Sequence, residues 1–83
     1  MITLTIYSRP GCHLCDEMAA VVARVTRALD TPVTIAHVDI SSDAELESRY
    51  GLDVPVLLVN GTKAAKYRVT EADLRRMLLG RAG

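Results

Sequence analysis

The hydrophobic residues change their spacing early in the chain, and this change restricts the available folds more than any other sequence feature. From Met1 to Tyr7 apolar and polar residues alternate, with Ile2, Leu4 and Ile6 on one side, which predicts a β-strand. Residues 8–11 interrupt the alternation. Apolar residues then recur at helical spacing, at Leu14, Met18, Val21, Val22, Val25 and Leu29. A strand that leads directly into an amphipathic helix indicates a fold of the α/β class.

The middle of the chain predicts a second strand and a short helix. The stretch from Val33 to about Ile40 is rich in β-branched residues, which favours a strand. An acidic helix is predicted over Ala44 to Tyr50, with Ser41 or Ser42 as its N-terminal cap. Gly51 is the residue expected to end that helix.

The last third of the chain predicts a hairpin and a final helix. Val56 to Val59 is fully apolar, which is typical of a strand buried on both faces. Asn60-Gly61 is a strong two-residue hairpin signal, so we expect a further strand over about Lys63 to Arg68. Thr70 and Asp73 resemble a capping box at the start of the last helix. The inner face of that helix would hold Leu74, Met77 and Leu78.

These elements predict a single α/β domain over residues 1–83, in the order β-α-β-α-β-β-α. A chain of 83 residues and 9.0 kDa has room for one domain only. The connection between the first two strands should be parallel, and the hairpin at Asn60-Gly61 should be antiparallel. The expected result is a four-stranded mixed sheet with helices on both faces.

The charges balance over the whole chain but separate along it. Ten Lys and Arg oppose ten Asp and Glu, so no net positive field attracts nucleic acid or an anionic membrane, and we expect neither as a partner. Residues 31–62 carry one base and five acids, whereas residues 63–83 carry six bases and two acids. These regions are either two solvated surfaces or a docking surface for a partner.

The two cysteines, Cys12 and Cys15, form a C-x-x-C pair between the first strand and the first helix. A disulfide between them closes too small a loop to stabilise the fold much. No apolar run approaches the roughly 20 residues of a membrane helix, and the alternating first residues do not resemble a targeting signal. We therefore expect a reducing compartment, the cytoplasm, in which the pair is kept for its chemistry.

The position of each cysteine on the predicted helix assigns it a role. Cys12 lies where free backbone N–H groups and the positive end of the helix dipole favour a thiolate, so it is the predicted nucleophile. Cys15 lies nearly one turn further on, at the edge of the apolar stripe, where it would be more buried and could resolve a mixed disulfide. An inert or metal-binding pair is the alternative. A zinc site needs four ligands, however, and only His13 and His37 remain to supply them.

The run from Tyr7 to Cys15, followed by Val54-Pro55 before an apolar strand, resembles the glutaredoxins. It is most similar to the short bacterial glutaredoxin-like proteins that carry His and Leu between their cysteines, and the resemblance covers essentially the whole chain. It implies a minimal thioredoxin fold, with Cys12 as nucleophile and Cys15 as resolving thiol. It also implies a cis peptide bond at Val54-Pro55, in a loop that faces the cysteines. From the residues alone, that bond is equally compatible with the trans form.

The resemblance further implies a set of substrate-binding residues. The backbone of Val54, beside Pro55, would pair with an extended substrate or with glutathione. Arg9 matches a basic position that binds the glycine carboxylate of glutathione and favours the thiolate, and its alternative is a solvated turn residue. Thr70 could hydrogen-bond a carboxylate in addition to capping the last helix. His13 could contact the Cys12 thiolate or remain an idle surface residue.

Two stretches depart from the pattern of the glutaredoxins. Those proteins usually carry a Gly-Gly pair after the hairpin, whereas this chain has side chains throughout Ala64 to Arg68, so glutathione as the reductant stays open. Lys66, Tyr67 or Arg68 could offer cationic or stacking contacts there, or the stretch could be a plain edge strand. His13-Leu14 replaces the usual Pro-Tyr dipeptide, so the reduction potential of relatives cannot be transferred.

Together these features predict a glutaredoxin-like thiol–disulfide oxidoreductase that is monomeric and binds no cofactor or metal. It would reduce protein disulfides or glutathione mixed disulfides. The electrons would come from glutathione as a co-substrate or from a thioredoxin-reductase-like partner. The alternatives are a non-catalytic thioredoxin-fold adaptor or redox-sensing module, and an iron–sulfur or zinc protein in which each chain of a dimer donates Cys12.

Overall fold

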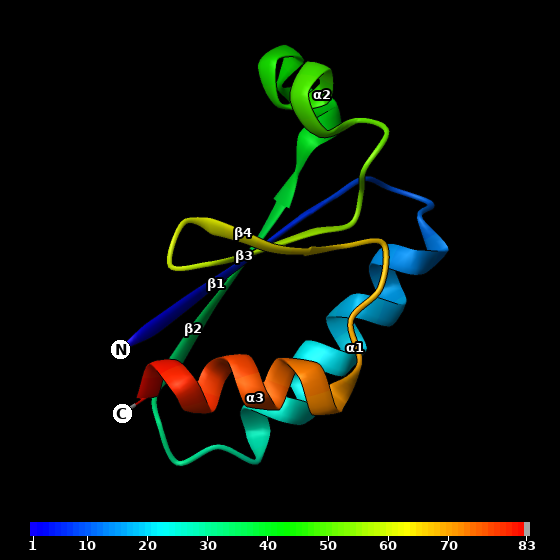
Figure 1. Ribbon diagram of the computed structural model, residues 1–83. Coiled ribbons are helices and arrows are strands. Elements are labelled where there is room, and N and C mark those ends of the chain that lie inside the picture. The colour runs from blue at the N-terminus through cyan, green and yellow to red at the C-terminus, as the bar shows by residue number, and fades with distance from the viewer. Residues whose placement is uncertain (83) are drawn as a thin grey trace.

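The computed structural model describes residues 1–82 and contains the predicted elements in the predicted order (Figure 1). In chain order they are β1 (Ile2–Ser8), α1 (His13–Arg27), β2 (Val33–Asp39), the 3-10 helix η1 (Ile40–Ser42), α2 (Ala44–Tyr50), β3 (Val56–Val59), β4 (Thr62–Lys66) and α3 (Glu71–Ala82). None of these helices is long and apolar enough to cross a membrane.

The four strands form one mixed sheet in the order β2-β1-β3-β4. Strand β1 runs parallel to β2 and antiparallel to β3, and β3 runs antiparallel to β4. The predicted parallel first connection and antiparallel hairpin are therefore confirmed. Strand β3 is buried along its whole length, as its apolar sequence predicts, because it lies inside the sheet with β1 and β4 on either side.

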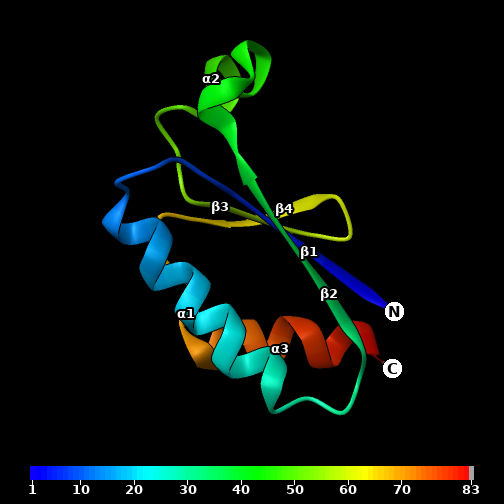
Figure 2. The ribbon, with the colours of Figure 1, turned by 180° about the vertical axis from the view of Figure 1, so that it is seen from behind.

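Helices α1 and α3 pack against each other and against one face of the sheet (Figures 1 and 2). The alternating residues of β1 supply the centre of this layer, and the helical stripe of α1 faces them. The buried members of this core are Ile2, Leu4, Ile6, Met18, Val22, Val25, Leu57, Val59, Leu74 and Leu78. Burial of this many apolar side chains is the main source of stability expected for the domain.

Helix α2 reaches the other face of the sheet at one end. Tyr7 alternates with Ile6 along β1 and so points away from the main core, and its ring lies 4.9 Å from the ring of Tyr50 on α2, centroid to centroid. Figures 1 and 2 place α2 beyond the end of β2, far from α1 and α3. The predicted helices thus lie on both faces of the sheet, but the second face has a helix only at its end.

The hairpin between β3 and β4 has the predicted two-residue turn. Asn60 and Gly61 both have positive φ angles, 51° and 84°, as a type I′ turn requires. The amide of Asn60 also fastens the turn to the neighbouring strand, because its Oδ1 accepts a hydrogen bond from the N–H of Thr3 at 2.9 Å.

Strand β4 occupies Thr62–Lys66, which is one residue earlier at its start and two residues shorter at its end than the predicted span. Tyr67 causes the early end. Its φ angle of 68° lies in the left-handed region, which is incompatible with an extended strand.

The cap of α2 is Asp43, whereas the sequence pattern favoured Ser41 or Ser42. The carboxylate of Asp43 accepts hydrogen bonds from the N–H groups of Glu45 and Leu46. The two serines instead form part of η1, a tight turn that separates them from the start of α2.

Gly51 follows the end of α2 as predicted, but it is not in the left-handed conformation that commonly favours glycine there. Its φ angle is −55°. A side chain is excluded by space instead, because a Cβ atom would lie 2.5 Å from the carbonyl oxygen of Glu47. The chain after α2 therefore stays close to the last turn of this helix.

Candidate active site

Three loops meet at one end of the sheet, and together they form the candidate site. Tyr7 near the end of β1 pairs with Val56 at the start of β3, which in turn pairs with Lys66 at the end of β4. The segments that follow β1, precede β3 and follow β4 therefore lie at the same end. They contain, respectively, the cysteine pair, the Val54-Pro55 dipeptide and Tyr67.

Cys12 and Cys15 are joined in a disulfide, with their sulfur atoms 2.21 Å and their Cα atoms 5.2 Å apart. Cys12 is the N-cap residue of α1 and is half-buried, whereas Cys15 lies in the first turn and is 5% exposed. The predicted difference in burial is confirmed. Cys12 is thus the more accessible of the two cysteines, and Cys15 is buried.

The start of α1 provides hydrogen-bond donors for the Cys12 sulfur. The backbone N–H of Cys15 donates to Cys12 Sγ at 3.1 Å. A cap position also places this sulfur at the positive end of the helix dipole. Both interactions would stabilise a thiolate at Cys12 in the reduced protein more than a thiol.

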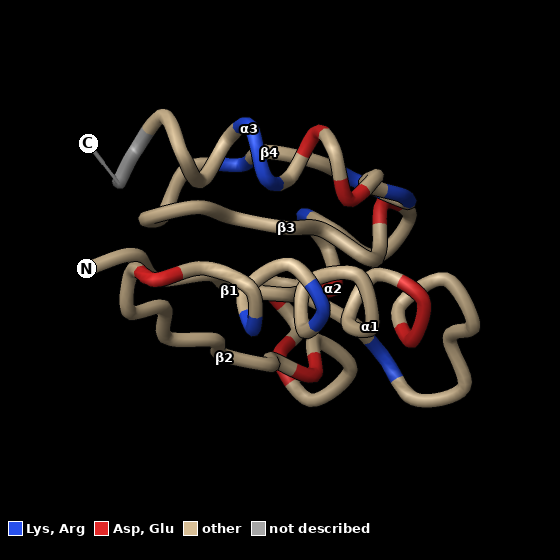
Figure 3. Tube along the Cα trace, turned by 90° about the horizontal axis from the view of Figure 1, so that it is seen from below, with Lys and Arg blue, Asp and Glu red and all other residues tan. Residues whose placement is uncertain are grey.

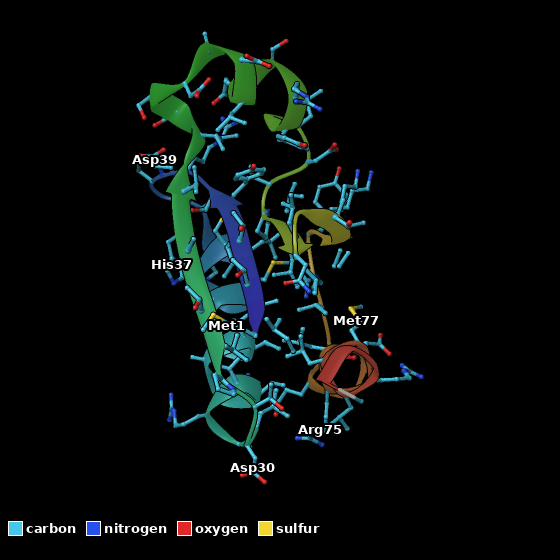
Figure 4. The ribbon with its side chains drawn as sticks, turned by 90° about the vertical axis from the view of Figure 1, so that its left-hand side faces the viewer. Met1, Asp30, His37, Asp39, Arg75 and Met77 are labelled. Atoms are coloured by element: carbon cyan, nitrogen blue, oxygen red, sulfur yellow. A yellow bond between two sulfur atoms is a disulfide. The ribbon has the colours of Figure 1, made fainter. Side chains whose placement is uncertain are left out.

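The two histidines lie apart from each other. His13 is the first residue of α1 and is exposed between the two cysteines. His37 points outward from the edge strand β2 (Figure 4). Within residues 1–82, no three His, Cys, Asp or Glu side chains are grouped so that they could hold a metal ion.

The Val54-Pro55 peptide bond is cis. Pro55 is buried and Val54 is half-buried directly before β3. The carbonyl of Pro55 accepts a hydrogen bond from the N–H of Tyr67 at 2.8 Å. This bond extends the pairing of β3 and β4 by one step and brings Tyr67 against the proline loop.

Arg9 connects the loop that precedes Cys12 to α2 and to the residue that follows it. One of its terminal nitrogens lies 2.5 Å from Glu47 Oε1 and 2.6 Å from the carbonyl oxygen of Gly51. The Nε of Arg9 is buried and lacks a hydrogen-bond partner in the described part of the chain. The guanidinium thus faces α2 and joins the cysteine loop to the proline loop.

Tyr67 connects the proline loop to the end of β4. Its hydroxyl lies 3.1 Å from the carbonyl oxygen of Leu52 and 3.3 Å from Asp53 Oδ1. Lys66 Nζ lies 3.7 Å from the same Asp53 oxygen. The side chain of Leu52 is 93% exposed, so polar contacts rather than packing hold this part of the loop.

A cavity of about 430 Å³ opens beside the site, between α1, β4 and the start of α3. Its walls are mostly apolar, with charged residues among them. They are formed by Glu17, Met18, Val21, Ala64, Ala65, Tyr67, Arg68, Val69, Thr70, Asp73 and Met77. Of the predicted substrate-binding residues, Thr70 lines this cavity, whereas Arg9, His13, Val54 and Pro55 do not.

The chain matches the family model of the glutaredoxin-like domain (DUF836) over residues 3–79. The chain therefore belongs to the glutaredoxin-like domain family. A comparison with curated proteins gives no match.

Solved structures agree with this assignment. The X-ray structure of the target protein XcR50 from X. campestris is 38% identical, over 93% of this chain and 96% of that one, with a TM-score of 0.77. Chloroplastic thioredoxin z is 14% identical, with 100% and 80% covered and a TM-score of 0.78. A thioredoxin mutant from Halobacterium salinarum NRC-1 is 21% identical, with 99% and 75% covered and a TM-score of 0.69. The two thioredoxins establish that this glutaredoxin-like domain has a minimal thioredoxin fold.

Thr70 caps α3 in this glutaredoxin-like domain as the sequence predicts. Its Oγ1 accepts a hydrogen bond from the N–H of Asp73 at 3.0 Å. The capping box is only half formed, because the Asp73 carboxylate pairs with Arg76 instead. Thr70 thus stands at a helix N-terminus that also borders the cavity.

Three residues of the site were not assigned their structural roles from the sequence. Glu47 accepts a hydrogen bond from Arg9, 38 residues away in the chain. Gly51 is required because a side chain at this position would clash with the carbonyl oxygen of Glu47. Tyr67 was expected only as an edge-strand residue or a surface contact. A sequence signal exists for Gly51, since glycine follows a helix there, but no local pattern identifies the partners of Glu47 and Tyr67.

Proposed function

We propose that this glutaredoxin-like domain is a thiol–disulfide oxidoreductase that reduces protein disulfides or glutathione mixed disulfides. The arrangement of the cysteine pair is the observation that carries the proposal. A half-buried Cys12 with a hydrogen-bonded sulfur at the helix cap is followed by a buried Cys15 within disulfide distance. This is the geometry that a nucleophilic thiolate and a resolving thiol require.

The first step of the proposed reaction uses Cys12. In the reduced protein its thiolate attacks one sulfur of the substrate disulfide, forming a mixed disulfide and expelling the other sulfur as a thiolate, which takes up a proton. The N–H of Cys15 and the helix dipole stabilise the charge on the attacking sulfur. The same stabilisation makes Cys12 a good leaving group later, when a donor thiol attacks the partner sulfur of a mixed disulfide with Cys12 and returns the pair to its dithiol form.

The second step uses Cys15. Its thiol loses a proton and attacks Cys12, which breaks the mixed disulfide and releases the second substrate sulfur as a thiol. Two electrons have then passed to the substrate, and the protein holds the Cys12–Cys15 disulfide seen in the structure. Two glutathione molecules or a thioredoxin-reductase-like donor would return the pair to its dithiol form.

Substrate binding is proposed at the three loops around the pair. The backbone of Val54 would pair with an extended segment of the substrate, beside Pro55. Thr70 and the N–H groups at the start of α3 are suited to a carboxylate, since a helix N-terminus favours anions. His13 is exposed next to Cys12 and can meet the substrate. One terminal nitrogen of Arg9 already contacts Glu47 and Gly51, so a substrate carboxylate would use the other terminal nitrogen of its guanidinium.

The experiment that tests this function separates the two cysteines. The Cys15→Ser protein is incubated with oxidised glutathione over a range of pH, and the intact mass reports a glutathione adduct. We expect a rapid adduct at Cys12 with a midpoint below about pH 7, because a capped thiolate is stabilised. The matched Cys12→Ser protein should react much more slowly, because Cys15 is buried.

The opposite result would exclude the catalytic mechanism. If Cys12 reacts only above about pH 8, as an unperturbed thiol does, its position has no catalytic consequence. The cysteines would then report the redox state of a non-catalytic adaptor. Metal analysis of the purified protein in the same series tests the iron–sulfur or zinc alternative directly.

A further inference from the structure

Tyr67 has a backbone conformation that is unusual for its residue type. Its φ angle of 68° lies in the left-handed region, where bulky side chains are rare and are disfavoured relative to glycine. Strained residues of this kind persist where surrounding interactions over-determine them, and they concentrate at functional sites. We therefore expect interactions outside the β3–β4 hairpin to hold Tyr67 in this conformation.

The hydrogen bonds of Tyr67 all go to the segment Leu52–Pro55. The backbone N–H of Tyr67 donates to the carbonyl of Pro55 at 2.8 Å. The phenol proton faces two acceptors, the carbonyl oxygen of Leu52 at 3.1 Å and Asp53 Oδ1 at 3.3 Å. Main chain and side chain of Tyr67 thus hold both ends of the segment that contains Val54.

The segment has little else to hold its middle. Leu52 is 93% exposed and contributes no buried packing. The N–H of Asp53 donates to the carbonyl of Tyr50 at 2.8 Å, and Arg9 binds the carbonyl of Gly51 at its other side. Asp53 also faces Lys66 at 3.7 Å, an exposed pair of small energetic value. The buried Pro55 fixes the chain directly after Val54, whereas hydrogen bonds, including those of Tyr67, hold the chain before it.

We propose that Tyr67 is a positioning residue that holds Val54 beside the cysteine pair in the geometry that receives a disulfide substrate. This inference rests on the proposed function. Tyr67 acts through Val54 and Pro55 and takes no part in the transfer of electrons. Its loss should weaken the binding of an extended peptide while leaving the reactivity of Cys12 unchanged.

The test uses two variants and a matched control. Tyr67→Phe removes the hydroxyl and keeps the ring, whereas Tyr67→Gly removes the side chain and also relieves the left-handed backbone. The control is Tyr50→Phe, because the described residues offer no hydrogen bond to the Tyr50 hydroxyl and its ring stacks on Tyr7. Thermal unfolding first verifies that all three proteins are folded.

Three measurements are made on the pre-reduced proteins. Stopped-flow reduction of a disulfide-containing peptide gives a half-saturating concentration and a limiting rate. Alkylation by iodoacetamide against pH reports Cys12 without using Val54. Amide hydrogen exchange at positions 53 and 67 reports the opening of the segment, because these N–H groups donate to the carbonyls of Tyr50 and Pro55.

We expect Tyr67→Phe to raise the half-saturating peptide concentration about two- to tenfold, the usual value of one lost hydrogen bond. Exchange at positions 53 and 67 should accelerate by a similar factor. The limiting rate and the alkylation profile should stay within about twofold, and Tyr50→Phe should resemble the wild type. Tyr67→Gly should open the segment at least as much, although its backbone is less strained.

Two results would overturn the proposal. One is unchanged exchange and unchanged half-saturation in both Tyr67 variants. The other is a change in the limiting rate or the alkylation profile as large as the change in half-saturation, which would mean that Tyr67 acts on Cys12 itself. If the wild type fails to reduce the peptide at all, the proposed function fails, and the exchange data alone then decide whether Tyr67 holds the segment.

Discussion

Helix α1 buries Cys15, Met18, Val22 and Val25, whereas none of the seven residues of α2 is buried. The two helices belong to the same small domain but are held by different interactions. Packing of apolar side chains holds α1 and α3 on the sheet. Helix α2 is held by the Asp43 cap, the ring contact of Tyr50 and the pairing of Glu47 with Arg9.

The redox pair lies where these two regions meet. Cys15 is the first buried residue of α1, and Cys12 precedes it as the half-buried N-cap residue. Cys15, the proposed resolving residue, is thus supported by packing, whereas hydrogen bonds hold much of the loop that precedes Pro55. Polar contacts of this kind can open locally at a smaller cost than a packed core.

The charged residues are also unevenly distributed over the molecule. Figure 3 shows basic residues along β4 and α3. Several exposed charges form pairs across elements, among them Arg24 with Glu71 and Lys66 with Asp53. Exposed ion pairs contribute little to stability, so these charges are not needed to hold the fold. The basic surface of β4 and α3 is therefore compatible with either alternative from the sequence, a solvated surface or a docking surface.

The largest change in the free energy of unfolding should come from the core between α1, α3 and the sheet. Leu74→Ala on α3 removes a side chain that is 0% exposed, which should lower the free energy of unfolding by about 2–5 kcal/mol. Leu79→Ala on the same helix is the matched control, because Leu79 is 57% exposed and its loss should change stability by less than about 0.5 kcal/mol. Urea unfolding measures both, and equal losses would refute the assignment of the core.

A second pair of variants examines the close contact at the end of α2. Gly51→Ala would place a Cβ atom 2.5 Å from the carbonyl oxygen of Glu47, so we expect a loss of about 1–3 kcal/mol in the free energy of unfolding. Gly80→Ala is the control, because a Cβ there meets no atom within 4 Å and alanine favours a helix, with a gain of up to about 1 kcal/mol. Thermal unfolding would contradict the comparison if both substitutions stabilised the protein.

The smallest effect should come from Asp39, at the polar end of β2. Hydrogen bonds from the side chain and backbone of Ser41, with a smaller contribution from Arg9, hold the pKa of Asp39 below its ordinary value of 3.8. Its carboxylate therefore stabilises the fold above pH 3.8, and this contribution is lost as the pH falls through the lowered pKa.

The variant Asp39→Asn should accordingly be slightly less stable than the wild type at neutral pH. The difference should shrink as the pH falls from 3.8 through the lowered pKa of Asp39, because the wild type then loses the charge as well. Urea midpoints against pH measure this, and Ser41→Ala, which removes the hydroxyl donor, should produce part of the same loss. A difference that persists unchanged in acid would show that the charge is unimportant.

Much of the fold and of the redox pair could be predicted from local sequence patterns. The alternation of β1, the stripe of α1 and the Asn60-Gly61 turn each reflect interactions between residues close in the chain. The roles assigned to the cysteines depend on the start of α1, and the burial of Cys15 follows from its place on the stripe. The cap of α2 was missed because three neighbouring polar residues, Ser41, Ser42 and Asp43, are all good caps.

Local patterns thus predict the order of the elements, most of the core-facing residues and the place of the C-x-x-C pair, because periodicity and capping are local; Leu14 and Met77, also predicted to face inward, are only half-buried and lie outside the core cluster. The contacts of Arg9 with Glu47 and Gly51 are visible only in the folded domain, as are those of Tyr67, directly after β4, with Leu52 and Asp53. Those partners lie 14 to 42 residues apart in the chain. Their meeting depends on the register of β1, β3 and β4, which no local pattern specifies.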